Sequence, residues 1–276
     1  MPCPDTRSGA RAITSLQNAS IKAIRRLNMR KARRETGLFL AEGASVLMTA
    51  RAAGWPPKSL VLLAGSAHQG ANSELIAWAR GQGADCLEVS AAVQGKLAAK
   101  DNPQSVLAVF EQRWMSTPDA LAVPANALWL ALEDVRDPGN LGTIIRTLDA
   151  VGASGAVLVG STVDPFSREA VRASMGSIFN VPLVRLRREA FLAWASRWPG
   201  EVVASALSAR EDFRATPYQL PVLLMMGSEG AGLSAELAAV ATRSVKIPMA
   251  GALDSLNLAV ATALMLYEIC RARLRL

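Results

Sequence analysis

The sequence predicts an α/β protein of two domains, and three observations lead to this prediction. The 276 residues are 51% apolar, which is enough for more than one sizeable core. Short apolar runs alternate with helical patterns, as in strands joined by helices. In the second half the runs are continuously apolar, which is typical of a parallel sheet buried on both faces. We therefore expect a small α/β domain followed by a larger parallel-sheet domain.

Composition places the boundaries of these domains. Residues 1–15 mix proline, glycine and scattered charges, and they are predicted to be a flexible tail. Residues 114–126 are small and polar with two prolines, and they are predicted to be a linker. Residues 16–113 and 127–276 remain as the two domains.

The first domain is predicted to alternate helices with short strands around one small core. A helix over 21–29 is expected from the spacing of its apolar residues. The elements expected after it are a strand at 38–40, a helix at 44–52, a strand at 60–63, a helix at 74–80, a strand at 86–89, a helix at 91–99 and a strand at 106–110.

A dense basic run begins in the first predicted helix. Residues 22–34 include seven Lys and Arg and no acid, and Glu35 follows directly. Most charge runs are solvated helix faces, but such faces usually include acids for i,i+4 pairing. Residues 1–120 hold 15 Lys and Arg against 9 Asp and Glu, whereas 121–276 hold 15 against 14. We therefore predict that the run contacts a phosphate backbone. The candidate residues are Arg25, Arg26, Arg30, Lys31, Arg33 and Arg34.

Several classes of protein are excluded by rare residues. Cys3, Cys86 and Cys270 are odd in number and widely spaced, which predicts neither a disulfide framework nor a zinc site. His68 is the only histidine, so a Ser-His-Asp triad and a histidine metal cluster are not expected. The first twenty residues lack the apolar core of a signal peptide, and residues 256–269 are too short to span a bilayer. We expect a metal-free, soluble protein of the cytoplasm.

The second domain repeats the alternation with longer apolar strands. Asn140 is expected to cap a helix over 141–150 that carries Arg146, and Ser255 to cap a helix that runs to about residue 273. Asn257 would then lie in the first turn of this last helix. The strands are expected at 128–132, 156–159, 181–186, 202–206, 222–226 and 244–247, and the apolar face of the last helix comprises Leu256, Ala259, Val260, Ala263, Leu264 and Tyr267.

Glycine-rich or proline-rich loops follow two of these strands. Gly227-Ser228-Glu229-Gly230 ends one apolar run, and Pro248 ends another. Glycine lets the backbone approach a ligand closely, and ligands of open α/β sheets bind beyond the carboxyl ends of the strands. A single loop of this kind is more often ordinary punctuation. The loops gain weight only when they are read together with residues 137–147.

Three segments then resemble one family. DPGNLGTIIRT at 137–147, MMGSEGAGLS at 225–234 and IPMAGALDSLNLAVA at 247–261 resemble, in order and spacing, the three signature motifs of the SpoU family of RNA 2'-O-ribose methyltransferases, within the SPOUT class. The likeness covers about the last 150 residues. Residues 18–113, which include RKARRETGLFLAEG, look like the small α/β substrate-binding domain, similar to ribosomal protein L30e, that many members carry.

The resemblance implies a fold, a cofactor and an oligomeric state. Members thread the C-terminal chain through a loop to form a trefoil knot, bind S-adenosylmethionine in the knot loops and act as dimers. Because chains almost never thread loops, the knot is expected from the resemblance alone. Carried over by position, the cofactor-binding residues would be Gly227, Ile247, Met249 and Leu256, and the catalytic set would be Asn140, Arg146, Glu229, Ser255 and Asn257.

The implied chemistry is attack by a ribose 2'-hydroxyl on the methyl group of a sulfonium. Arg146 stands where the family has its proposed activator of that hydroxyl. An arginine side chain has a pKa above about 12, so our hypothesis is that Arg146 holds the ribose and its 3' phosphate while phosphate or water accepts the proton. Glu229 and Asn257 would orient Arg146 and the loops. For Glu229 and Ser255, a plain loop acid and a plain helix cap are the alternatives.

Competing functions remain open at this point. Ribosomal RNA is the favoured substrate, and transfer RNA is the alternative. A non-catalytic RNA-binding protein of the same fold is a second alternative, although the polar catalytic set is intact. An oxidoreductase with a dinucleotide would need G-x-G-x-x-G after a first strand, and neither glycine-containing loop supplies it. Ser228 and Ala231 depart from common family residues, which affects the expected substrate preference more than the activity.

Overall fold

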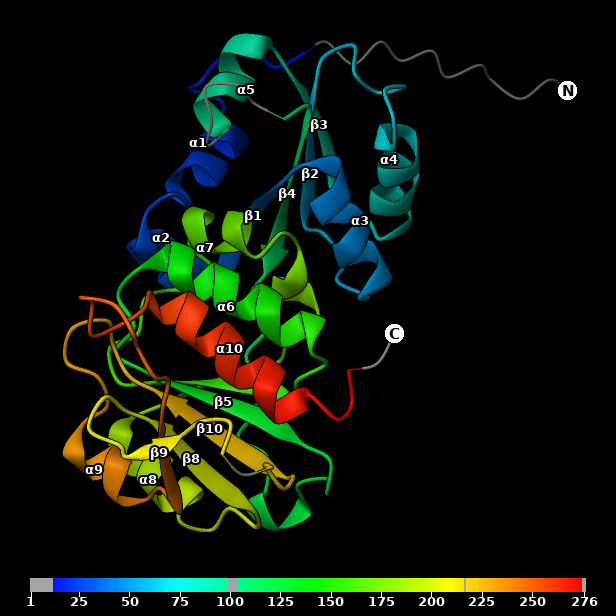
Figure 1. Ribbon diagram of the computed structural model, residues 1–276. Coiled ribbons are helices and arrows are strands. Elements are labelled where there is room, and N and C mark those ends of the chain that lie inside the picture. Colours follow the sequence, from blue (N-terminus) through cyan, green and yellow to red (C-terminus); the bar gives the residue numbers. More distant parts are fainter. Residues whose placement is uncertain (1–11, 99–103, 216, 275–276) are drawn as a thin grey trace, which may run out of the picture. The chain divides into compact units, whose positions relative to one another are not determined.

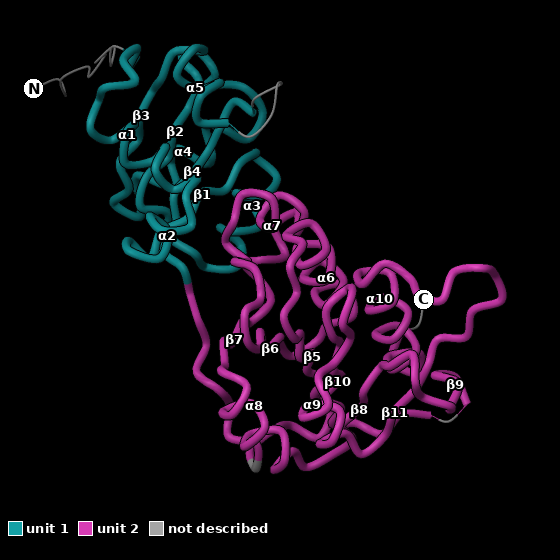
Figure 2. Tube along the Cα trace, turned by 90° about the vertical axis from the view of Figure 1, so that its left-hand side faces the viewer, with its two compact units in different colours: residues 1–112 teal, residues 113–276 magenta. Residues whose placement is uncertain are grey.

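A computed structural model describes residues 12–98, 104–215 and 217–274, and the chain divides into two compact units, residues 1–112 and 113–276 (Figure 2). The predicted tail lies mostly outside the described residues, as does Ala99 at the end of a predicted helix. The described part of the tail is attached, since the N–H of Ile13 donates to the carbonyl of Glu88 at 2.8 Å.

Unit 1 is built on a four-stranded mixed sheet with strand order β1-β4-β2-β3. β4 runs antiparallel to β1 and β2, whereas β2 and β3 are parallel. The strands are β1 (Leu38–Glu42), β2 (Ser59–Leu63), β3 (Asp85–Val89) and β4 (Val106–Glu111). Each one includes a run that was predicted from apolar residues.

Helices cover both faces of this sheet. α1 and α5 lie on one face and α3 and α4 on the other (Figure 1). Ile21 and Ile24 of α1 pack with Val93 of α5 against sheet residues such as Val61 and Leu107. The helices of unit 1 are α1 (Ala19–Arg26), α2 (Arg30–Thr36), α3 (Ala44–Ala52), α4 (Asn72–Gly81) and α5 (Ala91–Leu97).

The helix predicted over 21–29 ends earlier than expected, and a second helix that was not predicted follows it. α1 ends at Arg26, and α2 begins at Arg30. The guanidinium of Arg33 donates to the carbonyls of Leu27 and Asn28 at 2.8 and 3.0 Å. Carbonyls at a helix end have no hydrogen-bond partner inside the helix. The side chain of Arg33 supplies donors to two such carbonyls where the chain breaks between α1 and α2.

Unit 2 contains a seven-stranded sheet with strand order β7-β6-β5-β10-β8-β11-β9. Neighbouring strands in its described residues run parallel, which confirms the predicted parallel sheet. The strands are β5 (Leu128–Glu133), β6 (Gly155–Val159), β7 (Leu183–Leu186), β8 (Glu201–Ser205), β9 (Glu211–Asp212), β10 (Val222–Met226) and β11 (Arg243–Lys246). Every residue of β5 and β10 is buried, as continuous apolar runs require.

Two layers of helices enclose the sheet of unit 2. α6, α7 and α10 cover one face, and α8 and α9 cover the other (Figure 1). Trp194 of α8, Trp198 just after it and Leu237 of α9 form a core with Trp129 and Leu223 of the sheet. The helices are α6 (Pro138–Ala150), α7 (Arg168–Ala173), α8 (Arg188–Ala195), α9 (Ala235–Ala239) and α10 (Leu258–Cys270), with 3-10 turns η1 (Ala120–Ala122) and η2 (Ser177–Phe179).

The segment predicted as a linker packs onto unit 2. The ring of Trp114 meets Phe166 edge-on at 5.3 Å between centroids. The N–H of Met115 donates to the carbonyl of Leu183 at 2.8 Å, and the indole N–H of Trp194 donates to that of Pro118 at 2.9 Å. Residues 114–126 therefore differ from a free linker, because their aromatic and backbone groups find partners on the sheet and its helices.

Candidate functional site

Three loops leave the carboxyl edge of the parallel sheet in unit 2, where ligands of such sheets bind. Residues 134–137 follow β5, residues 227–234 follow β10, and residues 247–257 follow β11. β5 and β10 are neighbours in the sheet, and only β8 separates β10 from β11. The three motif segments are therefore brought together by the order of the strands.

The start of α6 corrects the prediction for Asn140. Asp137 is the N-cap, and its Oδ1 accepts from the N–H of Asn140 at 2.6 Å. Pro138 occupies the first turn, where a missing N–H costs nothing. Asn140 thus lies inside the helix, and its side chain is free to bond elsewhere.

The start of α10 corrects the prediction for Ser255 in the same way. Asn257 is the N-cap, because its Oδ1 accepts from the N–H groups of Ala259 and Val260 at 2.9 and 3.3 Å. The hydroxyl of Ser255 donates instead to Asp254 at 3.1 Å. The helix ends at Cys270 rather than near residue 273.

A chain of hydrogen bonds joins the three segments. The Nδ2 of Asn257 donates to the Oδ1 of Asn140 at 3.0 Å, and the Nδ2 of Asn140 donates to the Oε1 of Glu229 at 2.9 Å. This direction is fixed at both ends, since the cap uses the oxygen of Asn257 and an ionised carboxylate can only accept. Each amide therefore has one possible orientation, and the acid is tied to both helices.

Arg146 lies outside this network, and its side chain is exposed on α6. Gly142 and Asp149 lie about one helical turn before and after it, and both contact the segment that contains α7 and η2. A Cβ on Gly142 would meet the carbonyl oxygen of Ala170 at 2.4 Å, and Asp149 accepts from Asn180 at 3.0 Å. The side chain of Arg146 makes no hydrogen bond or ion pair with the described residues, which leaves all its donors for a ligand.

A cavity of about 560 Å³ lies among the loops that follow β8, β10 and β11. All four predicted cofactor-binding residues line it, together with Glu229 and Ser255. Asn140, Asn257 and Arg146 do not, although Asn140 donates to Glu229 in its wall and Asn257 donates to Asn140. The charged side chains that line it, among the described residues, are Glu229 and Asp254, and neither Lys nor Arg does so.

Gly227 is required by the shape of the loop in this wall. A Cβ at this position would lie 1.9 Å from the carbonyl carbon of Gly232 and 2.2 Å from the nitrogen of Leu233. The loop closes through paired bonds between the backbones of Ser228 and Gly232, at 3.2 and 3.0 Å. Any larger residue at position 227 would open it.

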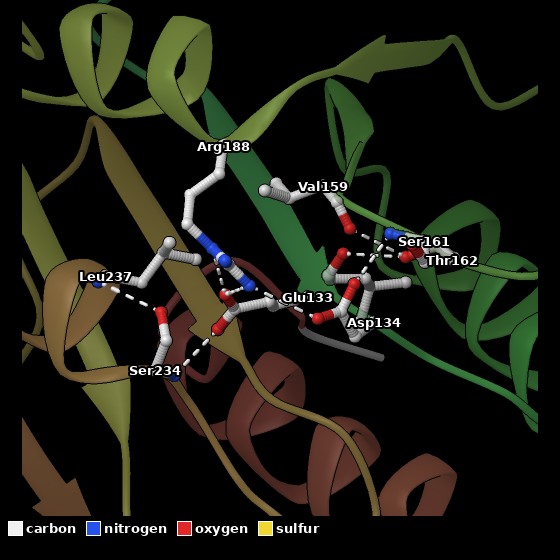
Figure 3. Close-up of polar contacts among 9 residues, drawn as sticks. Glu133, Asp134, Val159, Ser161, Thr162, Arg188, Ser234 and Leu237 are labelled. Atoms are coloured by element: carbon white, nitrogen blue, oxygen red, sulfur yellow. Dashed lines mark hydrogen bonds and ion pairs between the residues drawn. The ribbon is translucent and has the colours of Figure 1, made fainter.

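Sequence reasoning missed a second polar cluster, at the end of β5 (Figure 3). Glu133 is only 2% exposed, and its carboxylate accepts from Arg188 and from the backbone N–H of Ser234. The hydrogen bond to Glu133 raises the pKa of Arg188 above its usual range. The sequence did contain a signal for this cluster, because Glu133 ends a run that is otherwise fully apolar. A carboxylate that is buried there needs hydrogen-bond or ionic partners.

The basic run of unit 1 is mostly exposed, but one prediction in it is wrong. Arg33 is 4% exposed and bonds the carbonyls at the end of α1, so it is not available to a phosphate. Glu35 lies 3.8 Å from Lys31 and 3.9 Å from Arg26, so the run is partly paired. The other predicted residues, Arg25, Arg26, Arg30, Lys31 and Arg34, are exposed.

The apolar face predicted for the last helix is largely exposed. Val260, Leu264 and Tyr267 are 49%, 40% and 52% exposed, whereas Met265 and Leu266 are buried. The exposed side chains line a groove of about 390 Å³ together with Thr143, Thr147 and other residues of α6 and α10. The core therefore uses a different side of α10 from the predicted one.

Two further expectations concern metals and membranes. Within the described ranges no group of three or more His, Cys, Asp or Glu is arranged to hold a metal ion. No helix there is long and apolar enough to cross a membrane.

Known families and proteins resemble this chain over nearly its whole length. The model of the SpoU rRNA Methylase family matches residues 127–267, and that of the MRM3-like substrate binding domain matches 18–108. An uncharacterized tRNA/rRNA methyltransferase of Synechocystis sp. is 35% identical, covering 94% of this chain and 93% of the relative. RlmP of Bacillus subtilis, a 23S rRNA (guanosine(2553)-2'-O)-methyltransferase, is 29% identical, covering 93% and 98%.

A solved structure shows the same fold. The crystal structure of an rRNA methyltransferase from Sinorhizobium meliloti with bound S-adenosylmethionine superposes with a TM-score of 0.88. The two chains are 44% identical, and the match covers 96% of this chain and 99% of that one.

Proposed function

Because the chain belongs to the SpoU rRNA methylase family, we propose that it transfers a methyl group from S-adenosylmethionine to a ribose 2'-hydroxyl of ribosomal RNA. The observation that carries the proposal is the hydrogen-bonded chain Glu229–Asn140–Asn257. It joins all three motif segments beside one cavity, whose wall includes Glu229, as a shared reaction site requires.

The cavity fits S-adenosylmethionine in size and charge. Its volume of about 560 Å³ lies within the range of cofactor pockets, roughly 300–1,000 Å³. Ile247, Met249 and Leu256 supply apolar walls, and the Gly227 loop supplies backbone. Two acids and no Lys or Arg among its described lining residues suit a cationic sulfonium better than the pyrophosphate of a dinucleotide. This charge pattern disfavours the oxidoreductase alternative.

The bound cofactor would supply an activated methyl group, so the chain must mainly align the nucleophile, whose proton phosphate or water accepts. We assign Arg146 to the ribose and its neighbouring phosphate, which it can hold through two parallel N–H donors. We assign Glu229 the role of fixing Asn140, and Asn257 the role of anchoring both to α10. Ser255 and Leu256 line the cavity beside them.

Ribosomal RNA is favoured over transfer RNA by two relatives that match the chain over nearly its whole length. RlmP and the Sinorhizobium meliloti protein are both rRNA methyltransferases, and each matches both units of this chain. We propose that unit 1 binds the RNA through its exposed basic residues, including Arg25 and Arg30. The intact polar set argues against the non-catalytic alternative, and the proposed rRNA substrate supports a cytoplasmic location.

We also propose the homodimer and the trefoil knot that the family resemblance implies. Three large apolar side chains stay exposed on α10, and a dimer would bury them. The cavity is lined by the loops that follow β8, β10 and β11, and this arrangement supports a cofactor site built from knot loops. Light scattering of the purified protein at micromolar concentration checks the dimer.

A transfer assay with purified protein tests the function. Labelled methyl groups from S-adenosylmethionine are expected to enter ribosomal RNA and to leave alkali-resistant dinucleotides, because a 2'-O-methyl group blocks hydrolysis. Equal labelling of transfer RNA would support the alternative substrate. No labelling of any RNA, with intact binding of cofactor and rRNA, would contradict the proposed reaction.

A further inference from the structure

Glu133 is a buried acid that the proposed reaction does not use directly. Its Oε1 accepts from the Nε of Arg188 at 3.0 Å and lies 2.9 Å from the Nη2 in an ion pair, and its Oε2 accepts from the N–H of Ser234 at 2.7 Å. Figure 3 shows the carboxylate between these two groups. β5, α8 and the end of the loop 227–234 therefore meet at one side chain.

Stability alone does not account for a carboxylate at this position. The rest of β5 is apolar, and replacing a buried ion pair by apolar residues is often neutral or stabilising. What an apolar side chain lacks is direction. Glu133 makes directed bonds to partners 55 and 101 residues away, which fixes where those segments lie.

The loop 227–234 is held at both ends, and Glu133 provides one of the anchors. β10 and the close contact at Gly227 fix its start, and the bond to Ser234 fixes its end. Glu229 is exposed at the tip between them. A shift of Ser234 would therefore move Glu229 away from Asn140.

We propose that Glu133 is a positioning residue of the methyltransferase site, which holds the loop 227–234 in the shape that binds S-adenosylmethionine and presents Glu229 to Asn140. This inference rests on the proposed function. Arg188 keeps the carboxylate oriented, and Ser234 receives the effect through its backbone.

The cluster contains its own control in Asp134. Its Oδ1 accepts from the N–H of Ser161 at 2.6 Å, and its Oδ2 accepts from Arg188 at 3.3 Å. Asp134 has a positive φ of 51°, which Asn also tolerates. An Asp134→Asn change thus perturbs the same arginine without touching the loop 227–234.

Cofactor affinity, measured by calorimetry without RNA, is the first test. We expect Glu133→Gln to weaken S-adenosylmethionine binding about tenfold and to lower kcat/KM for the cofactor roughly tenfold to a hundredfold, because misplacement by about 1 Å has effects of that size. Asp134→Asn is expected to change either value less than twofold. Equal losses in the two variants, or a loss of unfolding midpoint alone, would overturn the inference.

A second pair of variants isolates the hydrogen bond without altering the buried charge. Ser234 has φ −63°, which proline adopts, so Ser234→Pro removes the N–H donor together with the α9 cap. Ser234→Ala removes the cap only. The proline variant should bind the cofactor more weakly than the alanine variant, and this difference should disappear in a Glu133→Gln background. A difference that persists there would contradict the role of Glu133.

These readouts separate the two proposals. Failure of the unmodified protein to methylate RNA would remove the proposed function. Normal methylation by the unmodified protein and by Glu133→Gln would remove only the positioning role.

Discussion

The two units hold their polar side chains in opposite ways. In unit 2, Asn140, Glu229 and Asn257 are joined by hydrogen bonds of 2.9 and 3.0 Å. In unit 1, the exposed side chains of Arg25 and Arg30 make no hydrogen bond or ion pair with the rest of the described chain. Transfer of a methyl group depends on position, whereas attraction to phosphates depends mainly on charge. The difference predicts that unit 2 is sensitive to single atoms and unit 1 to total charge.

The largest effect is expected at Arg146. If only the charge of this side chain mattered, unit 2 would behave like unit 1 and the contrast between the units would be lost. Arg146→Ala should lower kcat roughly 100- to 1,000-fold, because the nucleophile loses its positioning group. Arg146→Lys keeps the charge but loses the planar fork, and it should stay well below the unmodified rate. Single-turnover methylation of rRNA measures both.

Arg197, an exposed arginine next to α8, provides a matched control in the same unit. Arg197→Ala should methylate rRNA at the unmodified rate. Near-normal turnover of Arg146→Lys would contradict the fork and leave a simple charge as the contribution of this position.

A smaller loss is expected at Asn257, where one atom can be changed and the helix cap kept. Aspartate caps helices about as well as asparagine, so Asn257→Asp should change the free energy of unfolding by less than about 0.5 kcal/mol. It removes the Nδ2 donor to Asn140, and kcat should fall roughly tenfold. Urea unfolding and methylation rates, measured together, check this. A stable variant with full activity would show that the network is only structural.

Variants in the basic run of unit 1 test whether this unit depends on total charge. Arg25→Ala should weaken rRNA binding modestly and reduce the slope of log affinity against log salt by about 0.7–0.9, as expected for one lost phosphate contact. Arg33→Ala should leave that slope unchanged and destabilise the protein by about 1–3 kcal/mol, because two carbonyls lose their donor. Filter binding across a salt series and urea unfolding separate the two. The reverse result would restore Arg33 as a phosphate contact.

The smallest effect on methylation is expected at Tyr218. Its side chain is held by Arg243 and by a hydrogen bond to the carbonyl of Phe213, outside the proposed site. Burial raises the pKa of Tyr218 to about 12, and Arg243 lies 4.6 Å from its ring centroid. Folding favours the neutral phenol, so its stabilising contribution is complete below about pH 10 and is lost as the pH rises through about 12.

The chain has two tyrosines, so Tyr267→Phe leaves phenolate absorbance to Tyr218 alone. In Tyr267→Phe we expect the phenolate absorbance of Tyr218 to titrate with a midpoint near 12. In Tyr218→Phe we expect an unchanged methylation rate. A midpoint near 10 would show that the ring is more open to water than in the structure.

Most strands of unit 2 were predictable, because a short run such as 222–226 is apolar at every position and is therefore expected to be buried inside a sheet. The capping residues were not. Asp137 and Asn140 are both good caps within four positions, as are Ser255 and Asn257, and tertiary partners decide between them. Asn140 donates a hydrogen bond to Glu229, which lies 89 residues further along the chain, and no local sequence pattern indicates this contact.

Charge runs show the same limit. Arg33 is one of seven basic residues in its run, and only the break between α1 and α2 gives it a buried role. Glu133 is the converse case, since a single acid at the end of an apolar strand carries no motif until Ser234 and Arg188 are folded against it. Local spacing predicts elements, whereas long-range contacts assign the work of individual side chains.

The most direct test of the account is ribose-methylation mapping of ribosomal RNA from cells that lack this chain and from the same cells supplied with it. We expect that one 2'-O-methyl site disappears, that the unmodified protein restores it, and that Arg146→Ala, present at the same level, does not. Restoration by Arg146→Ala, or an unchanged map in cells without the chain, would contradict it.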